Sequence, residues 1–340
     1  MTEVNQQILL KKRPVGVPSA DDFERGEGAV RSPGDEEVLL KNLYLSMDPA
    51  IRGWMSDAKS YLPPVAIGEP IRSGTLSQIV ESNAEGWPVG QIVQALAAWE
   101  SFSTVPASNL HGKVKRIEGI PLPPMLSVLG GTGLTAYFGL LEVGRPEEGE
   151  TVVVSAAAGG VGSIVGQIAR IKGCRAVGLT GSDDKCAWLT DELGYDAAIN
   201  YKTADLRIAL KEACPKGIDV FFDSVGGEIL NTALARLNRR GRVALCGAIS
   251  QINAGELPPG PSNYLQLLAK SARMEGFTTL DFARRYDEAR ADLARWIHSG
   301  KLKYRDDIVD GLENAPSHLL RLFTGGHRGK LMVKLADPEV

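Results

Sequence analysis

The fold is indicated most clearly by one stretch, Thr151-Val-Val-Val-Ser155-Ala-Ala-Ala-Gly159-Gly160-Val161-Gly162. Residues 151–155 show no polar alternation, which is typical of a strand buried on both faces. From about residue 160 to 172 apolar residues recur every three to four positions, which predicts an amphipathic helix. A buried strand, a glycine-rich turn and a helix in this order favour a site for the pyrophosphate of a dinucleotide. The alternative is a plain tight turn that binds nothing.

The sequence around this stretch extends the pattern in both directions. Strand-like and helical segments alternate, with strands at 175–179, 197–200, 218–222 and 241–245 and helices at 183–193, 204–213, 228–237 and 282–299. This alternation predicts right-handed βαβ units and a doubly wound parallel sheet. The first ~125 residues instead contain short apolar runs broken by Gly, Pro and Ser, which predict a compact β domain. We therefore expect an α/β protein with a β domain over 1–126, a dinucleotide-binding domain over 127–300, and a segment over 301–340 that returns to the β domain through a strand at 331–335.

Composition excludes several classes of function. The 38 basic and 41 acidic residues give a net charge of -3, so there is no electrostatic footprint for nucleic acid or for anionic lipid. The four cysteines form no CxxC pair, which favours free thiols in a reducing compartment. The N-terminus has no apolar signal core, and no run of eighteen apolar residues occurs. These features predict a soluble, cytoplasmic protein.

The end of the predicted second strand indicates which dinucleotide binds. An acidic residue there would hold a ribose 2′-hydroxyl and repel a 2′-phosphate. This chain has Leu179-Thr-Gly-Ser182-Asp-Asp-Lys185, in which Ser182 offers a hydroxyl and Lys185 a cation. Tyr201, after the third strand, is placed to cover the phosphate or ribose. The pattern predicts NADP(H) rather than NAD, although Lys185 could also be an ordinary surface lysine.

Metal-ligating residues are scarce in the predicted β domain. Residues 1–125 contain no cysteine and one histidine, His111. A catalytic zinc site needs Cys and His ligands, so we expect no metal. The chain also lacks a GxSxG nucleophile elbow.

Several longer motifs make the chain resemble a zinc-independent medium-chain dehydrogenase/reductase. Within that family it is similar to the branch of leukotriene hydroxydehydrogenase/prostaglandin reductase, plant alkenal double-bond reductases and curcumin-reductase-like enzymes. The motifs run from about residue 40 to the C-terminus: Ser46-Met-Asp-Pro-Ala-Ile-Arg52, Gly133-Leu-Thr-Ala-Tyr137, Ser155–Gly162, Asn200-Tyr-Lys-Thr203, Asp223-Ser-Val-Gly-Gly227, Cys246-Gly-Ala-Ile-Ser250, Leu257-Pro-Pro-Gly260, Arg273-Met-Glu-Gly-Phe277 and Gly326-His-Arg-Gly-Lys330. The resemblance implies a GroES-like β domain, a Rossmann domain, and a homodimer formed through the edge of the Rossmann sheet.

The resemblance also implies the cofactor contacts. Residues of the glycine turn would contact the pyrophosphate, and Lys185 and Tyr201 would bind the 2′-phosphate. Later segments of the chain would contact the nicotinamide and its ribose. The full implied set is Pro49, Gly159, Gly160, Val161, Gly162, Ser182, Lys185, Tyr201, Ser224, Cys246, Gly247, Ala248, Ile249, Ser250, Phe277, Thr278, Thr279 and His327.

The substrate side departs from the family pattern. Ala50 stands where the family usually has a tyrosine, and Ile252 replaces the tyrosine credited with hydrogen-bonding the substrate carbonyl. Ser224 and His327 each replace an asparagine, and Gly131-Thr132 replaces a Met-Pro pair. The hydroxyl donors that remain are Tyr61, Tyr264, Ser250 and the cofactor ribose.

The expected activity is NADPH-dependent reduction of the C=C bond of α,β-unsaturated aldehydes or ketones. Hydride addition at the β-carbon leaves an enolate, which a hydroxyl donor can stabilise without a metal. Two alternatives stay open, namely a quinone or carbonyl reductase on the same scaffold and a catalytically inactive NADPH-binding protein.

Overall fold

The computed structural model describes residues 4–57, 62–254 and 258–339. The chain forms two compact units, one made of Met1–Ser127, Asp306–His327 and Leu331–Val340, the other of Val128–Arg305 and Arg328–Lys330. Within the described ranges, no helix combines the length and the apolar character needed to cross a membrane. The assignment of one unit to substrate and the other to cofactor stays a prediction.

The first unit is built from antiparallel strands, as its broken apolar runs predict. A hairpin pairs β1 (Val4–Leu10) with β2 (Phe23–Ala29). A seven-stranded sheet has the order β14-β15-β3-β4-β5-β7, with β6 added on β3. Its strands are β3 (Glu37–Ser46), β4 (Arg72–Ser82), β5 (Ile92–Ala98), β6 (Phe102–Pro106), β7 (Leu110–Lys113), β14 (Asp306–Asp310) and β15 (Lys330–Lys334). The helices are α1 (Ala50–Trp54) and α9 (Ala315–Thr324). The C-terminal strand β15 pairs antiparallel with β3, so the end of the chain adds to the sheet that its first part forms.

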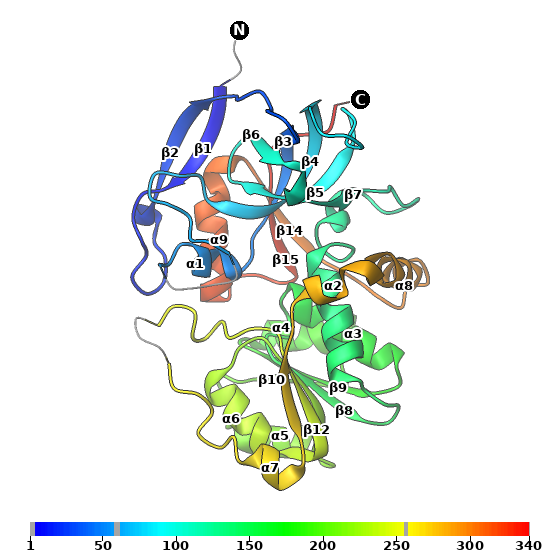
Figure 1. Ribbon diagram of the computed structural model, residues 1–340. Helices are drawn as coiled ribbons and strands as arrows, with labels where there is room; N and C mark the ends of the chain where they lie inside the picture. The colour runs from blue at the N-terminus through cyan, green and yellow to red at the C-terminus, as the bar shows by residue number, and fades with distance from the viewer. Residues whose placement is uncertain (1–3, 58–61, 255–257, 340) are drawn as a thin grey trace. The chain divides into compact units, whose positions relative to one another are not determined.

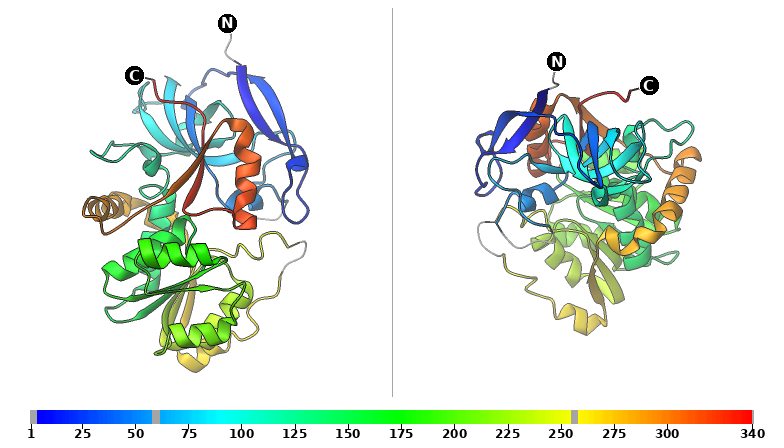
Figure 2. Two further views of the ribbon diagram at one scale, coloured as in Figure 1. Left: turned by 180° about the vertical axis from the view of Figure 1, so that it is seen from behind. Right: turned by 45° about the horizontal axis from the view of Figure 1, so that its top comes forward.

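The second unit contains a six-stranded parallel sheet with the order β10-β9-β8-β11-β12-β13. Its strands are β8 (Thr151–Val154), β9 (Arg175–Thr180), β10 (Ala197–Asn200), β11 (Ile218–Asp223), β12 (Leu237–Leu245) and β13 (Arg273–Gly276). The helices are α2 (Gly131–Phe138), α3 (Gly160–Ile171), α4 (Asp183–Ala187), α5 (Leu206–Ala213), α6 (Gly227–Ala235), α7 (Gln266–Lys270) and α8 (Tyr286–His298). Figures 1 and 2 show helices on both sides of this sheet. The doubly wound α/β fold is therefore confirmed.

Burial explains the apolar run that opens the second unit. Val152, Val153 and Val154 of the central strand β8 are all fully buried. Helices α5 and α6 pack on one face of the sheet through side chains such as Leu210 and Ile229. With both faces covered, a strand needs no polar alternation.

The predicted elements differ from the observed ones mainly at their ends. Helix α5 begins at Leu206 rather than 204, because the Asp205 carboxylate caps the amides of Arg207 and Ile208. Strand β12 begins at Leu237 rather than 241, since Leu237 already pairs with Ile218 of β11. The register is irregular between this pair and the next one, Arg242 with Val220. The predicted helix over 282–299 starts only at Tyr286, after a 3₁₀ segment over Thr279–Arg285.

Candidate nucleotide site

The glycine turn between β8 and α3 has the close backbone packing that a pyrophosphate site requires. A Cβ built on Gly162 would lie 2.4 Å from the Ala156 carbonyl oxygen and 2.7 Å from Ala157 Cα. The helix therefore presses directly on the turn, and its first amides, which have no partner within the helix, face the place where an anion would lie. The tight left-handed position falls on Ala156, at φ 49°, although a glycine is more usual in such a turn.

A buried tyrosine holds α3 in this position. The Tyr195 hydroxyl donates to the Gly162 carbonyl at 2.6 Å and accepts from the Gly166 amide at 3.1 Å. A Cβ on Gly166 would come within 1.9 Å of the tyrosine ring, so the contact depends on that glycine. Burial raises the pKa of Tyr195, so the hydroxyl keeps its proton. Sequence reasoning missed this residue, although the small residues at 162 and 166, one helical turn apart, were a signal.

The carboxylate of Asp223 joins the carboxyl ends of β8 and β11. It accepts from the Ser155 hydroxyl at 2.8 Å and from the amides of Val225 and Gly226 at 2.9 and 3.1 Å. Burial raises the pKa of Asp223, and its hydrogen bonds partly offset that effect. The order of the sheet reverses between these two strands, and a doubly wound sheet binds its ligand at that switch point. Sequence reasoning quoted the Asp223 motif but gave this side chain no role.

The segment after β12 lies at the same end of the sheet. The Cys246 and Gly247 amides donate to the Asp223 carbonyl at 2.8 and 3.1 Å. The Ser250 hydroxyl donates to the Val225 carbonyl at 2.6 Å. Burial raises the pKa of Cys246 to about 11, so this side chain is a neutral thiol near pH 7. The two segments lie together because each follows a strand of the parallel pair β11 and β12, and their contact with the cofactor stays a prediction.

Ser224 provides a test of whether the site suits a polar ligand. Its hydroxyl oxygen is buried, and among the described residues no hydrogen-bond partner of ordinary geometry faces it. The polar group beside the hydroxyl is the Cys246 thiol, which is a weak partner. A buried hydroxyl without a partner is costly, so a ligand that supplies one would be stabilised there. Together with the glycine turn, this fits the nicotinamide dinucleotide that the sequence predicts.

The adenosine end of the predicted site lies where β9 runs into α4. Ser182 is the N-cap position of α4, and Lys185 lies in its first turns. A Cβ on Gly181 would lie 3.2 Å from the Tyr201 hydroxyl and 3.1 Å from Lys202 Cε, so both side chains lie over this turn. Burial, followed by the charges of Lys202 and Arg328, lowers the pKa of Lys185. The structure thus brings Ser182, Lys185 and Tyr201 together, as expected.

The other predicted site residues have different outcomes. Phe277 stacks edge-on against Phe222, and the Thr278 hydroxyl bonds Asp281 at the start of the 3₁₀ segment that includes Thr279. Pro49 and His327 belong to the first unit, so their part in the cofactor site stays a prediction. Tyr61 lies outside the described residues.

The role of Tyr264 as a catalytic donor stays a prediction. Tyr264 is 58% exposed and directly precedes α7, which leads into the amino end of β13. A nucleotide binds at the carboxyl ends of parallel strands. Figure 1 shows α7 at the opposite end of this unit from α3.

Two residues of the sequence motifs have structural roles. The Tyr137 hydroxyl donates to Asp292 at 2.9 Å, and its ring stacks on Trp296, so it joins α2 to α8. Arg52 is buried, and its guanidinium donates hydrogen bonds to the Pro14 and Gly16 carbonyls. These bonds fix the loop that precedes the 3₁₀ turn Ala20–Asp22.

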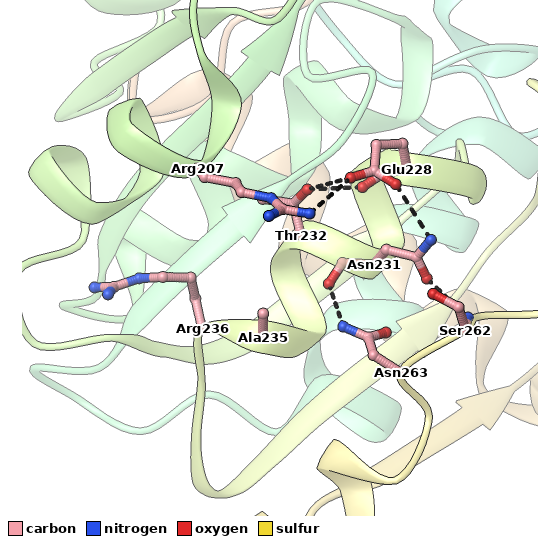
Figure 3. Close-up of a pocket in the computed structure, with 8 residues that line it drawn as sticks. All are labelled: Arg207, Glu228, Asn231, Thr232, Ala235, Arg236, Ser262 and Asn263. Atoms are coloured by element: carbon pink, nitrogen blue, oxygen red, sulfur yellow. Dashed lines mark hydrogen bonds and ion pairs between the residues drawn. The ribbon is translucent and has the colours of Figure 1, made fainter.

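A separate hollow of about 310 Å³ lies on the outer side of α6. Figure 3 shows that it is polar, with Glu228 contacting Arg207, Asn231 and Thr232 across it. None of the predicted cofactor residues lines it. Across the parts of the chain that the structure describes, no group of three or more His, Cys, Asp or Glu side chains has a metal-binding arrangement.

Comparison with known proteins shows which family the chain is similar to. Residues 6–112 match the family "N-terminal domain of oxidoreductase", and residues 160–297 match "Zinc-binding dehydrogenase". The chain is 46% identical to a putative NADP-dependent oxidoreductase of Bacillus subtilis over all of both chains. It is 41% identical to the NADPH-dependent curcumin reductase of Escherichia coli and 38% identical to the NADP(+)-dependent 2-alkenal reductase of Nicotiana tabacum, over 98% of each chain. The crystal structure of CurA in complex with NADPH from Vibrio vulnificus matches with a TM-score of 0.90 and 41% identity, covering 98% of this chain and 100% of that one.

Proposed function

The chain belongs to the medium-chain dehydrogenase/reductase family, in the branch of the NADP(H)-dependent curcumin and 2-alkenal reductases, and on this basis we propose that it reduces conjugated C=C bonds. Its substrates would be α,β-unsaturated aldehydes and ketones. The observation that carries the proposal is the full-length similarity to a 2-alkenal reductase, combined with a described nucleotide turn that fits a dinucleotide. NADPH, when bound, supplies the hydride.

The chain's own residues would position the cofactor and stabilise charge on the substrate. The first turn of α3 would hold the pyrophosphate, and the segments after β11 and β12 would border the nicotinamide. Addition of hydride at the β-carbon leaves negative charge on the carbonyl oxygen, which needs a hydrogen-bond donor. A solvent proton then reaches the α-carbon, so that the reaction consumes one hydride and one proton.

Ser250 is the described candidate for the donor, and Tyr61 is a second candidate. The Ser250 hydroxyl donates to Val225 in this structure and would have to turn to the substrate oxygen. Removal of a donor of this kind costs about 10²–10³ in kcat. The kcat and KM of Ser250→Ala and of Tyr61→Phe are therefore measured and compared with those of the wild type. A fall in kcat of that size in one variant identifies its residue as the donor. If both variants keep the wild-type kcat, the cofactor ribose hydroxyl is the remaining donor.

The activity itself is tested with matched pairs of acceptors. NADPH oxidation is measured with an enal and its saturated aldehyde, an enone and its saturated ketone, and a quinone. With NADPH deuterated at C4, the label is then located in the product by NMR. Deuterium at the β-carbon, with no turnover of the saturated partners, is expected. Deuterium on a carbinol carbon, oxidation confined to the quinone, or binding without any turnover would refute the proposal. Dialysis against a zinc chelator is expected to leave kcat/KM unchanged.

We also propose that the enzyme is a homodimer formed through β13. This strand is at the edge of the parallel sheet, so one side of its backbone is not paired within the sheet. The neighbouring Leu265 and Leu268 are 62% and 79% exposed, so they offer an apolar surface that a second copy of the chain would cover. Light scattering during size exclusion should give twice the chain mass, and Leu268→Glu should lower it. A monomer at micromolar concentration would contradict this.

A further inference from the structure

Positive charge gathers at the turn from β9 into α4. Lys185 lies in α4, Lys202 lies over Gly181, and the guanidinium of Arg328 approaches the same helix from a distant part of the sequence. Sequence analysis assigned a role to Lys185 alone.

The backbone around Arg328 shows why it reaches this place. The Gly329 amide donates to the Ala158 carbonyl at 2.9 Å, and Gly329 forms an isolated parallel bridge with Gly159. Residue 328 is therefore held beside the pyrophosphate turn. Its side chain extends from there to Asp184, with Nη2 3.7 Å from the Asp184 carboxylate. In a doubly wound fold, the adenosine ribose lies between these two turns.

The charges around Arg328 are poorly balanced in the free protein. The Arg328 side chain is 34% exposed and that of Asp184 is 85% exposed, so their ion pair contributes little and is easily exchanged. Lys202 and Arg328 both act on Lys185 as like charges, and lower its pKa in addition to burial. Asp183 accepts a hydrogen bond from the neutral Asn200 amide at 2.8 Å and keeps its charge, so together with Asp184 it offsets only part of the charge of three cations. A doubly charged phosphate among these cations would remove the repulsion.

We propose that Arg328 binds the 2′-phosphate of NADPH together with Lys185 and Lys202, and that it exchanges its contact with Asp184 for this phosphate. Arg328 is then a specificity-determining residue that favours NADPH over NADH. Its planar guanidinium can bind two phosphate oxygens at once, which a lysine cannot do. The inference rests on the proposed function only for the identity of the cofactor.

Binding measurements without an acceptor test this. NADPH, NADH and 2′,5′-ADP are titrated against the wild type, Arg328→Gln, Arg328→Lys and Asp184→Asn. Arg207→Gln is the matched control, because Arg207 is an exposed arginine of the same unit that lines the pocket in Figure 3. For Arg328→Gln we expect the Kd of NADPH and 2′,5′-ADP to rise on the order of 10–100-fold, and that of NADH by less than about twofold. Arg328→Lys should lie between, Asp184→Asn should bind NADPH as tightly as the wild type or more tightly, and the control should match the wild type.

Two results would overturn the proposal. If Arg328→Gln weakens NADPH and NADH equally, the residue acts on the shared part of the dinucleotide or on the fold. If it changes neither, the guanidinium stays on Asp184. A wild-type chain that binds NADPH and reduces no enone would refute the proposed function, while the binding comparison would still decide the role of Arg328.

Discussion

Replacement of Gly159 by alanine should weaken NADPH binding while it leaves the fold intact. Gly159 has φ -81°, which alanine adopts readily, and the nearest described atom to an added Cβ is the Ala156 carbonyl oxygen at 3.2 Å. The added methyl would nevertheless stand on the turn that the pyrophosphate must approach. Loss of one amide bond to a charged phosphate costs about 1.5–3 kcal/mol, so the Kd for NADPH should rise on the order of 10–100-fold.

Gly162→Ala provides the contrast. Its Cβ would lie 2.4 Å from the Ala156 carbonyl oxygen and 2.7 Å from Ala157 Cα, and backbone atoms cannot yield as a flexible side chain can. Relief needs a shift of about 1 Å between helix and turn, and overpacking of this kind costs about 1–3 kcal/mol. At about 2–4 °C per kcal/mol the Tm of the free protein should fall by several degrees. Gly53→Ala is the control, since no described atom within 4 Å of that helical position would meet a Cβ.

The assay combines a fluorescence titration of NADPH with thermal unfolding in the absence of cofactor. Gly159→Ala should lose affinity at an unchanged Tm, Gly162→Ala should lose both, and Gly53→Ala neither. Wild-type affinity in Gly159→Ala would refute the reasoning, because the dinucleotide would then not approach this turn. The reasoning would also be contradicted if Gly159→Ala lost affinity for NADPH only in proportion to a fall in its Tm.

Three further changes test the groups around the turn. Tyr195→Phe removes two buried hydrogen bonds from α3 and should lower the free energy of unfolding by about 1–3 kcal/mol in denaturant titrations; an unchanged value would show that the hydroxyl does not stabilise the helix. Burial raises the pKa of Asp223 in the folded protein above its ordinary value of 3.8. The folded protein therefore loses stability as pH rises from the pKa of Asp223 in the unfolded chain to its higher pKa in the folded protein. Asp223→Asn should therefore gain stability relative to the wild type as pH rises from about 4, and a pH-independent difference between the two proteins would contradict this. Lys185→Ala should weaken NADPH much more than NADH in the same titrations, and equal weakening would remove Lys185 from the phosphate site.

The parallel unit was predictable because its signals are local. Buried strands such as β8 contain continuous apolar runs, and the glycine turn is contiguous in sequence. Prediction failed where a distant partner decides the structure. Strand β12 starts early because Leu237 pairs with Ile218 of β11, a contact that the local sequence does not reveal. The predicted helix over 183–193 is an α-helix over Asp183–Ala187 followed by a π-helix over Trp188–Glu192.

The candidate site divides in the same way. Residues of one motif, such as Gly159 and Gly162, could be assigned from their spacing alone. Asp223 could not, because the hydroxyl that it binds is 68 residues away in the chain. The position of Tyr264 could not be predicted in this way either, because nearness in sequence to β13 does not tell which end of the strand the residue approaches.

The contacts of Asp223 have a consequence for repeated turnover. One carboxylate already fixes the amides of Val225 and Gly226, and the main-chain oxygen of the same residue fixes those of Cys246 and Gly247. Ordering a mobile loop costs roughly 1–2 kcal/mol per residue. Because the loops after β11 and β12 are already ordered, this cost would not arise each time a dinucleotide binds. Spent NADP⁺ can therefore leave and fresh NADPH arrive without rebuilding these two loops, and the speed of that exchange should depend on the phosphate contacts.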